Sequence, residues 1–270
     1  MKINLEDKIT RFVVQEYVGA IVGFGSLAEL DFMTHKLIHT FEVARIAEKL
    51  VALTTPKLPV KLQKKIIDAA ILHDVGRCYE FKKKSKKFDH GLKGSELIQK
   101  KFPNLIQEQL STLWHNKAPS DSDPIQAQPL LDYTRDADIL GNLDYNIRQM
   151  PIFLKHIVQQ FPQTKTELKI NDEIISAARA HRPCCYRNME KFDFLDMMLA
   201  QLAWIYNLRT TAGFKLAKKE KLFPRYRDVV VAKVVPALSG SQKQKQQTAK
   251  QILSLFPDDM FLKEFEKHGI

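Results

Sequence analysis

Cysteine is scarce, and its few positions do not suggest a framework of bonds. The chain of 270 residues contains only Cys78, Cys184 and Cys185. An odd number with one adjacent pair is a poor basis for disulfides, and the absence of a CxxC motif argues against a cysteine zinc site. We therefore expect reduced cysteines in a reducing compartment.

The sequence also lacks a long apolar run. The uncharged stretch from Tyr17 to Ala28 is too short to cross a bilayer. The first residues do not follow the order of a signal peptide, which has a basic start, an apolar core and a cleavage site. These features predict a cytoplasmic protein without a membrane span.

Alternating strand-like segments are almost missing. Leucine, isoleucine and alanine instead recur at three- and four-residue spacings, which is typical of helices. Only "DVVVAKVV" at 228–235 has strand-like composition, and it could equally be a buried helix. The predicted helices cover about 27–53, 59–75, 91–101, 104–116, 128–143, 146–160, 166–181, 192–208 and 245–255.

These patterns predict an all-α fold. We expect one helical domain over residues 1–230, which includes a helical lead-in at its N-terminal end. The polar stretch that begins near "SGSQKQKQQTAKQ" marks a composition shift. We therefore expect residues 231–270 to form a C-terminal helical extension that packs on the same domain.

Positive charge dominates the chain, with a formal net charge of +11 and a pI near 9.4. Such an excess favours anionic partners, such as phosphorylated small molecules, nucleotides or nucleic acid. A lysine-rich surface that only keeps the protein solvated would give the same net charge.

Two histidines lie on helix faces that the pattern predicts to be buried. His39 shares a face with Val43 and the apolar residues that follow it, and His73 follows Ile66 and Ala70 at helical spacing. A buried polar side chain needs a partner, because burying it alone costs free energy. Both histidines therefore need an acceptor, a donor or a bound ion.

Two aspartates are placed to face the same interior. Asp74 lies about 100° further round the helix than its neighbour and can reach the same cavity. Asp138 shares a helix face with Thr134 and Gly141, whose small side chains leave room for a bound group. Gly76 is suited to ending the helix that carries Asp74.

Each of these residues alone has an ordinary structural explanation, such as a backbone hydrogen bond or a helix cap. The case for a site depends on the ordered set of nitrogen and oxygen donors within one helical bundle. That set is His39, His73, Asp74, His90, His115 and Asp138.

The order H…HD…D resembles the HD-domain superfamily of metal-dependent phosphohydrolases, over roughly residues 30 to 225. The contexts match as well as the letters: "HTFEVARIA" around His39, "AAILHDVGR" around His73 and Asp74, and "RDADILGNLD" around Asp138. The resemblance implies a helical bundle around a metal site. The region "DFLDMMLAQLAWIYNL" is similar to the later helix of a poorly characterised bacterial branch with HDIGRF-type motifs.

Two further histidines extend the resemblance to the subgroup that binds two metals. These are His90 in "DHGLKGSEL" and His115 in "LWHNKAP". Two-metal relatives often have a His-His pair where this chain has His115 and Asn116. His35, four residues before His39, could bind the same ion, but the resemblance favours His39 alone.

The donor set contains nitrogen and oxygen but no sulfur. It suits Fe, Mn, Ni, Co or Zn better than Mg alone, which prefers oxygen ligands. The resemblance implies that Asp74 bridges two ions, and we expect one or two divalent transition-metal ions. The implied division is His39, His73 and Asp138 on one ion, and His90 and His115 on the other.

Cationic residues next to this set suggest a phosphorylated substrate. Arg77 takes the place of a lysine that relatives often carry near the substrate phosphate, and a guanidinium can bind phosphate through two hydrogen bonds. The alternative is that Arg77 has no role in binding and only interacts favourably with the C-terminal end of a helix. The lysine run from Lys82 to Lys87 joins two ligand-bearing segments, so Lys84 and Lys87 are candidate substrate-binding residues. A solvated loop is the alternative for this run.

The function implied is hydrolysis of a phosphomonoester or phosphodiester, with a nucleotide as the substrate class. Asp74 and Arg77 are the candidate catalytic residues, and a hydroxide held by the metal is the nucleophile. The GYP signature of cyclic-di-GMP phosphodiesterases is absent, so that substrate is not inferred. Two alternatives stay open: a di-iron oxygenase on the same scaffold, and a non-catalytic binder of nucleotide or nucleic acid.

Overall fold

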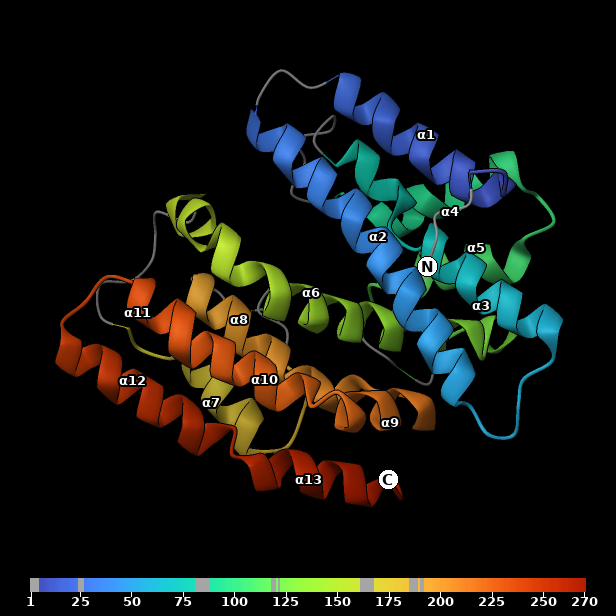
Figure 1. Cartoon of the computed structure of the whole chain (residues 1–270). Coiled ribbons are helices and arrows are strands. Elements are labelled where there is room, and N and C mark those ends of the chain that lie inside the picture. Colours follow the sequence, from blue (N-terminus) through green and yellow to red (C-terminus); the bar gives the residue numbers. More distant parts are fainter. Residues whose placement is uncertain are drawn as a thin grey trace. The chain divides into compact units, whose positions relative to one another are not determined.

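The computed structural model describes residues 5–23, 27–80, 88–117, 120, 122–160, 168–184, 189 and 192–270. Within these ranges every regular element is helical, which confirms the predicted all-α fold. No helix among them combines the length and apolar character that a membrane span requires. The chain divides into two compact units, residues 1–141 and 142–270, and this boundary falls inside one long helix (Figure 1).

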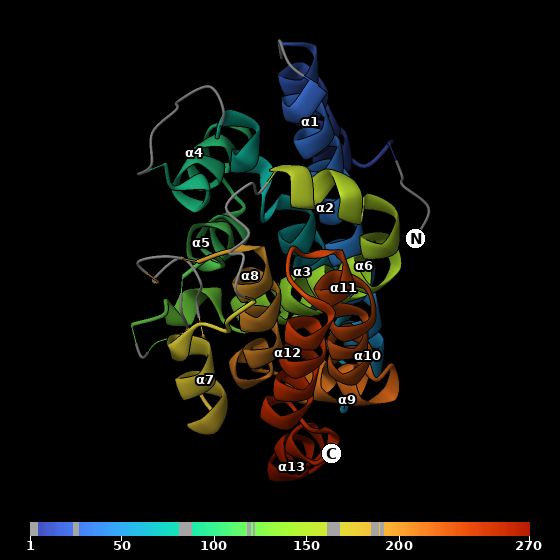
Figure 2. The same cartoon turned by 90° about the vertical axis from the view of Figure 1, so that its left-hand side faces the viewer.

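Unit 1 holds the helices that carry the candidate ligands. In Figure 2, α4 and α5 lie beside each other. The elements are α1 (Lys8–Val22), α2 (Leu27–Leu53), α3 (Val60–Leu72), η1 (Val75–Tyr79), α4 (His90–Lys101), α5 (Ile106–Trp114), η2 (Ile125–Ala127) and the first part of α6 (Leu130–Gln160).

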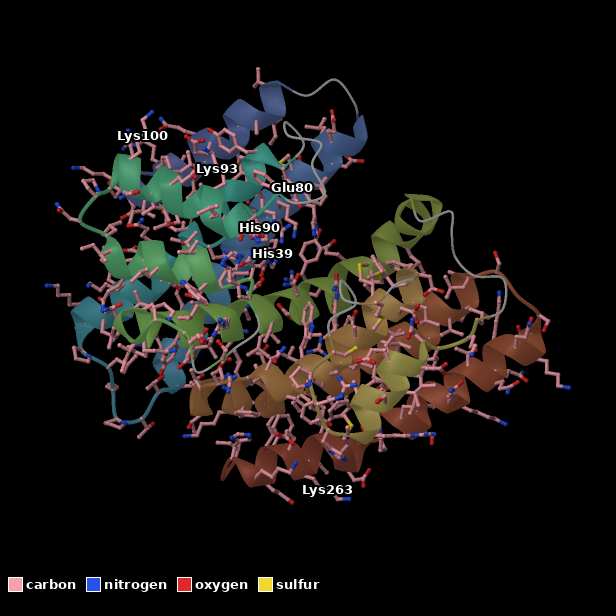
Figure 3. All side chains as sticks on the ribbon, turned by 180° about the vertical axis from the view of Figure 1, so that it is seen from behind. His39, Glu80, His90, Lys93, Lys100 and Lys263 are labelled. Atoms are coloured by element: carbon pink, nitrogen blue, oxygen red, sulfur yellow. The ribbon has the colours of Figure 1, made fainter. Side chains whose placement is uncertain are left out.

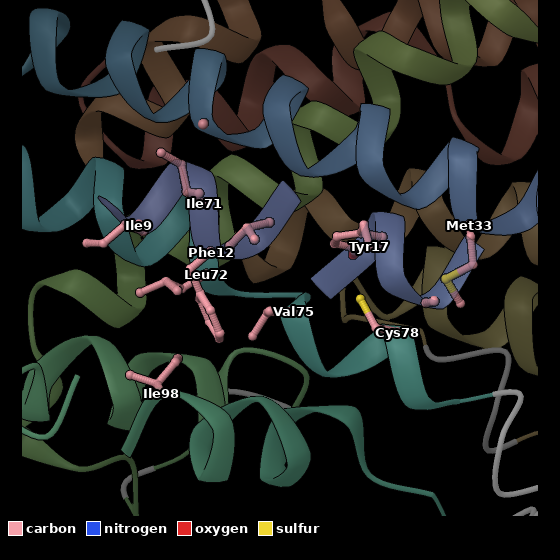
Figure 4. Packing of buried hydrophobic residues seen from close by; sticks show 12 residues of the cluster. Ile9, Phe12, Tyr17, Met33, Ile71, Leu72, Val75, Cys78 and Ile98 are labelled. Atoms are coloured by element: carbon pink, nitrogen blue, oxygen red, sulfur yellow. The ribbon is translucent and has the colours of Figure 1, made fainter. Parts of the chain in front are cut away.

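An apolar cluster joins α1 to the elements around His73. Its members include Phe12 and Tyr17 from α1, Leu72 from α3 and Val75 and Cys78 from η1, all buried (Figure 4). Burial of such side chains stabilises the fold by roughly 1.5–3 kcal/mol each. The segment that carries the His-Asp pair is therefore anchored in the core on one side.

Several helices lie where the sequence predicts them. The range 27–53 matches α2, and 91–101 matches α4 to within one residue. The predicted break between 143 and 146 is wrong, because α6 runs without interruption from Leu130 to Gln160. Gly141 and Asn142 are common at helix ends, but buried Leu140 and Leu143 keep this part of the helix packed.

Unit 2 is built from the rest of α6 and short helices after it. These are α7 (Asp172–Arg179), α8 (Phe194–Leu202), η4 (Ala203–Asn207), α9 (Thr211–Lys219), α10 (Leu222–Val229), η5 (Val230–Val234), α11 (Val235–Ala237), α12 (Gln242–Leu255) and α13 (Asp258–Lys267). The stretch 228–235 is helical, so its strand-like composition reflects buried valines rather than a strand. The division predicted at residue 230 differs from the boundary between the units and stays a prediction.

Candidate metal centre

Buried histidines reach one interior region of unit 1 from several helices. His39 lies in the middle of α2, and its side chain is 1% exposed. His73 caps the C-terminal end of α3 and is fully buried, and Asp74 follows it with 2% exposure. The sequence prediction that these three side chains point inward agrees with their positions.

The two additional histidines lie at helix ends. His90 is the first residue of α4, and Asp89 caps that helix by accepting hydrogen bonds from the backbone N–H groups of Gly91 and Leu92. His115 directly follows α5. Asn116 Nδ2 donates to Asp89 Oδ1 at 3.2 Å, so the residues next to the two histidines are joined. Asn116 therefore has a structural partner at the position where two-metal relatives often carry histidine.

The four imidazole rings form a continuous series. Ring centroids are 5.5 Å apart for His39 and His73, 5.2 Å for His73 and His115, and 5.2 Å for His115 and His90. Figure 3 labels the two ends of this series, His39 and His90, which come from α2 and α4. The structure thus brings together all four histidines that the sequence singles out.

The Asp74 carboxylate lies between two groups of histidines. Its Oδ1 atom is 3.3 Å from His90 Nε2 and 3.4 Å from His115 Nε2. Its Oδ2 atom is 3.7 Å from His73 Nε2. The donor atoms of His39, His73 and Asp74 lie within 4.8 Å of one another, and the same holds for Asp74, His90 and His115. Each group could hold a metal ion, with Asp74 common to both.

Asp138 completes the first group from α6. Its Oδ1 atom is 3.0 Å from His39 Nε2 and 3.8 Å from His73 Nε2. Its side chain is 28% exposed, more than the other members of the set. Gly141, one turn further along, approaches Val43 of α2 so closely that an added Cβ would lie 3.1 Å from Cγ2 of that valine. The space that the sequence suggested beside Gly141 therefore serves close packing of α2 against α6.

Backbone carbonyls determine which nitrogen of two histidines carries the proton. His73 Nδ1 is 2.7 Å from the carbonyl oxygen of Ala70, and His115 Nδ1 is 2.7 Å from that of Thr112. A carbonyl oxygen only accepts, so each Nδ1–H donates and each Nε2 turns its lone pair inward. Hydrogen bonds of this kind orient metal-binding histidines.

The inward nitrogen of His73 is the clearest indication of a metal-binding site. Burial lowers the pKa of His73 to about 4, although Asp74 and Asp138 act in the opposite direction. The imidazole is therefore neutral near pH 7. Its Nε2 atom is buried and has no hydrogen-bond partner among the residues that the structure describes. A buried, unpartnered lone pair that faces two carboxylates fits a bound metal ion.

Both carboxylates remain ionised in this region. Burial would raise the pKa of Asp74, but Arg77 and His73 hold the pKa well below its usual value. Burial likewise opposes ionisation of Asp138, and His39 and His73 hold its pKa below the usual range. Ionised carboxylates and neutral imidazoles are the protonation states that metal binding requires.

Two cations lie beside Asp74. Arg77 Nε is 3.2 Å from both carboxylate oxygens of Asp74, and Arg77 Nη1 donates to Glu80 Oε2 at 2.9 Å. Lys36 Nζ, from α2, is 3.9 Å from Asp74 Oδ2. Burial and Arg77 lower the pKa of Lys36, whereas Asp74 and Asp138 raise it. The structure thus brings Arg77 to the site, as the sequence predicted, and adds Lys36.

Gly76 has a role that the sequence did not indicate. The helix before it ends at Leu72, so Gly76 does not end that helix but lies inside η1. An added Cβ at Gly76 would lie 2.0 Å from the carbonyl oxygen of His90. Only glycine allows this close approach, which holds the Asp74 segment against the start of α4.

Comparison with protein families agrees with this geometry. Residues 37–146 match the family model for the HD domain. This segment of the chain is similar to the HD domain. The HD superfamily consists mostly of metal-dependent hydrolases, and its hydrolases act on phosphate-containing substrates. Searches of curated proteins and of solved structures found no significant match.

The match covers all six candidate ligands and Arg77. The two other predicted substrate-binding residues, Lys84 and Lys87, lie outside the described residues, so their role stays a prediction. Sequence reasoning missed Lys36. Its position three residues before His39, on the same side of one helix, is a signal that could have found it.

Proposed function

We propose that this chain is a metal-dependent phosphohydrolase that cleaves a phosphomonoester or a phosphodiester, with a nucleotide as the substrate class to test first. The observation that carries the proposal is the position of Asp74. Its two carboxylate oxygens face separate histidine groups, while Arg77 contacts the same carboxylate. The arrangement suits a bridged pair of metal ions beside a phosphate-binding cation.

The proposed ligands divide into two groups. His39, His73 and Asp138 would hold one ion, and His90 and His115 the other, with Asp74 shared between them. The nitrogen and oxygen donors favour Fe, Mn, Ni, Co or Zn. A bound divalent ion supplies a nucleophile near neutral pH by lowering the pKa of water.

Backbone and side-chain groups of the protein would orient the ligands and bind the substrate. The carbonyl oxygens of Ala70 and Thr112 fix the orientation of two histidine ligands. Arg77 binds a phosphoryl oxygen and stabilises the charge that builds up there during the reaction. Glu80 accepts from Arg77 Nη1 at 2.9 Å and so orients the guanidinium for this role.

A substrate screen with matched metal analysis tests the proposal. The protein is reconstituted separately with Mn²⁺, Fe²⁺ and Zn²⁺, and hydrolysis of nucleoside monophosphates and of a phosphodiester is followed by product formation. We expect activity that EDTA removes and that Asp74→Asn abolishes. His268→Asn, at an exposed histidine outside the candidate site, serves as the control and is expected to retain activity.

Two outcomes would replace the proposal. Oxygen uptake by the iron-loaded protein, with no hydrolysis of any phosphate ester, would identify a di-iron oxygenase built on the same donor set. Binding of nucleotides without turnover under every metal condition would instead indicate a non-catalytic binding protein.

A further inference from the structure

Lys36 is a mostly buried ammonium group with incomplete pairing. Its side chain is 14% exposed, and its closest carboxylate contact is the one to Asp74 Oδ2, at 3.9 Å. Across the part of the chain that the structure describes, its Nζ atom makes no hydrogen bond. The ring of Phe32 lies 5.7 Å away, within the range of a weak cation–π contact.

This position is costly unless something else compensates the charge. An ammonium group removed from water loses its hydration, and a single contact near 4 Å replaces only part of it. The Asp74 carboxylate cannot compensate Lys36 alone, because Arg77 already lies 3.2 Å from both of its oxygens. Two cations therefore share the Asp74 carboxylate, and of the two it is Arg77 that also pairs with Glu80.

Metal binding would increase the imbalance. The acidic side chains close to Lys36 and Arg77 are Asp74, Asp138 and Glu80. Bound divalent ions would take the charge of Asp74 and Asp138 for their own ligation and leave only Glu80 to compensate Lys36 and Arg77. A group with two negative charges and several acceptor oxygens would compensate this excess better than a group with one.

We propose that Lys36 and Arg77 together bind a terminal phosphate, so that the site selects phosphomonoesters over phosphodiesters. A terminal phosphate carries about −1.5 to −2 charge near neutral pH and presents three acceptor oxygens. Arg77 supplies planar donors, and Lys36 supplies a compact positive charge. This inference rests on the proposed phosphohydrolase function and names the class of its substrate.

Isothermal titration calorimetry with two small probes tests the inference without turnover. Inorganic phosphate represents the terminal phosphate, and dimethyl phosphate represents a singly charged diester. Protein reconstituted with Mn²⁺, at a metal content confirmed by elemental analysis, is titrated with each probe. The variants are Lys36→Met, Lys36→Arg and, as the control, Lys61→Met. Lys61 is an exposed residue near the start of α3, the end far from His73.

The expected result is a difference between probes and between variants. Wild type should bind inorganic phosphate about tenfold more tightly than dimethyl phosphate. Lys36→Met should weaken phosphate binding by about tenfold, which corresponds to about 1.4 kcal/mol, because the variant loses a hydrogen bond to a charged group. Lys36→Arg should restore most of the affinity, and Lys61→Met should match wild type. If Lys36→Met does not fold, Lys36→Gln is measured in its place.

Equal affinity for the two probes, or equal loss in Lys36→Met and Lys61→Met, would overturn the inference. Metal-dependent hydrolysis together with either result would leave the proposed function standing. Conversely, phosphate binding that depends on Lys36 in a protein that hydrolyses neither class of ester would support the phosphate site and contradict the proposed function.

Discussion

The hydroxyl group of Tyr17 donates a hydrogen bond to the backbone carbonyl oxygen of Asp74, with 3.0 Å between the two oxygens. The same hydroxyl lies 3.3 Å from Thr40 Oγ1, and the tyrosine is fully buried. Tyr17 belongs to α1, which precedes the residues matched by the HD domain. Helix α1 therefore holds the backbone of the His-Asp pair in place through this hydrogen bond.

Replacing Tyr17 by Phe should destabilise the protein and loosen the metal centre. The change removes one of two donors to the carbonyl oxygen of Asp74 and leaves only the backbone N–H of Arg77, at 2.9 Å. The loss of one buried hydrogen bond costs about 0.5–1.5 kcal/mol. Urea denaturation should show this loss, and calorimetry should show weaker metal binding. Tyr79→Phe is the matched control, since its hydroxyl bonds to Glu16 Oε2 at a less buried position. Metal affinity lowered equally in both variants would contradict the role of Tyr17.

The inward direction of the ligand side chains could be predicted from the sequence. The contacts from other helices that hold these residues in place could not. His39 lies on α2, and His73 and Asp74 directly follow α3. Their inward direction follows from the helical spacing of the apolar residues next to them. Tyr17 approaches Asp74 only because α1 packs against η1, a contact across many residues that no local pattern encodes. Lys36 lies between these two cases. Its spacing from His39 is visible in the sequence, but its burial could not be predicted.

The same distinction applies to the helices. The ends of α2 were predictable because its apolar pattern begins and ends there. The continuation of α6 past Gly141 and Asn142 was not, since burial of neighbouring leucines overrides the preference of those two residues for helix ends. The sequence pattern predicts that Gly76 ends a helix. In the structure, the absence of a side chain at Gly76 instead allows close contact with the backbone of His90.

Bound metal should depend on the His-Asp pair. We expect one or two transition-metal ions per chain in reconstituted protein, and their loss in His73→Ala and Asp74→Ala. The physical reason is that His73 faces both carboxylates with an unprotonated nitrogen. Elemental analysis after gel filtration measures the content. Absence of metal from wild type after reconstitution with each candidate ion would refute a metal centre.

The second ion can be tested separately at His115. Its Nε2 atom is 3.4 Å from Asp74 Oδ1, in the group that also contains His90. His115→Ala should therefore lower metal content by about half, while circular dichroism shows an unchanged helical fold. Unchanged metal content would indicate a single ion held by the group of His39 and His73, and would leave His115 with another role.

The metal-free protein should lose stability as the pH falls from about 6.5 to 4. Burial lowers the pKa of His73 to about 4, whereas an unfolded histidine titrates near 6.5. Between these values the unfolded chain binds a proton that the folded chain does not, so the free energy of unfolding decreases with decreasing pH. The contribution of His73 is on the order of 3 kcal/mol.

Urea denaturation of EDTA-treated protein from pH 7 to 3 measures this dependence. His73→Gln should flatten it, because glutamine does not titrate. A second, more acidic loss should remain in that variant, since the lowered pKa values of Asp74 and Asp138 add stability only above about pH 4. Equal slopes for wild type and His73→Gln between pH 6.5 and 4.5 would show that His73 is not held neutral.

The lysine run and Arg77 should affect catalysis in different ways. The run consists of Lys82, Lys83, Lys84, Lys86 and Lys87. If these lysines attract an anionic substrate, changing all five to Gln should lower kcat/KM at low salt and leave kcat nearly unchanged. Added salt should reduce the difference, because the Debye length is about 8 Å at 0.15 M. Arg77→Ala should instead lower kcat at every salt concentration, since the guanidinium lies directly beside Asp74.

A salt series with one phosphorylated substrate separates these effects. The matched control changes five lysines of α12 and α13 to Gln, which alters the net charge equally in unit 2: Lys243, Lys245, Lys250, Lys263 and Lys267. If the electrostatic field of the lysine run acts locally at the site, kcat/KM should fall more in the variant of that run than in the control. If the two five-lysine variants behave alike, the run acts through net charge alone, and substrate attraction is not specific to the segment between Asp74 and His90.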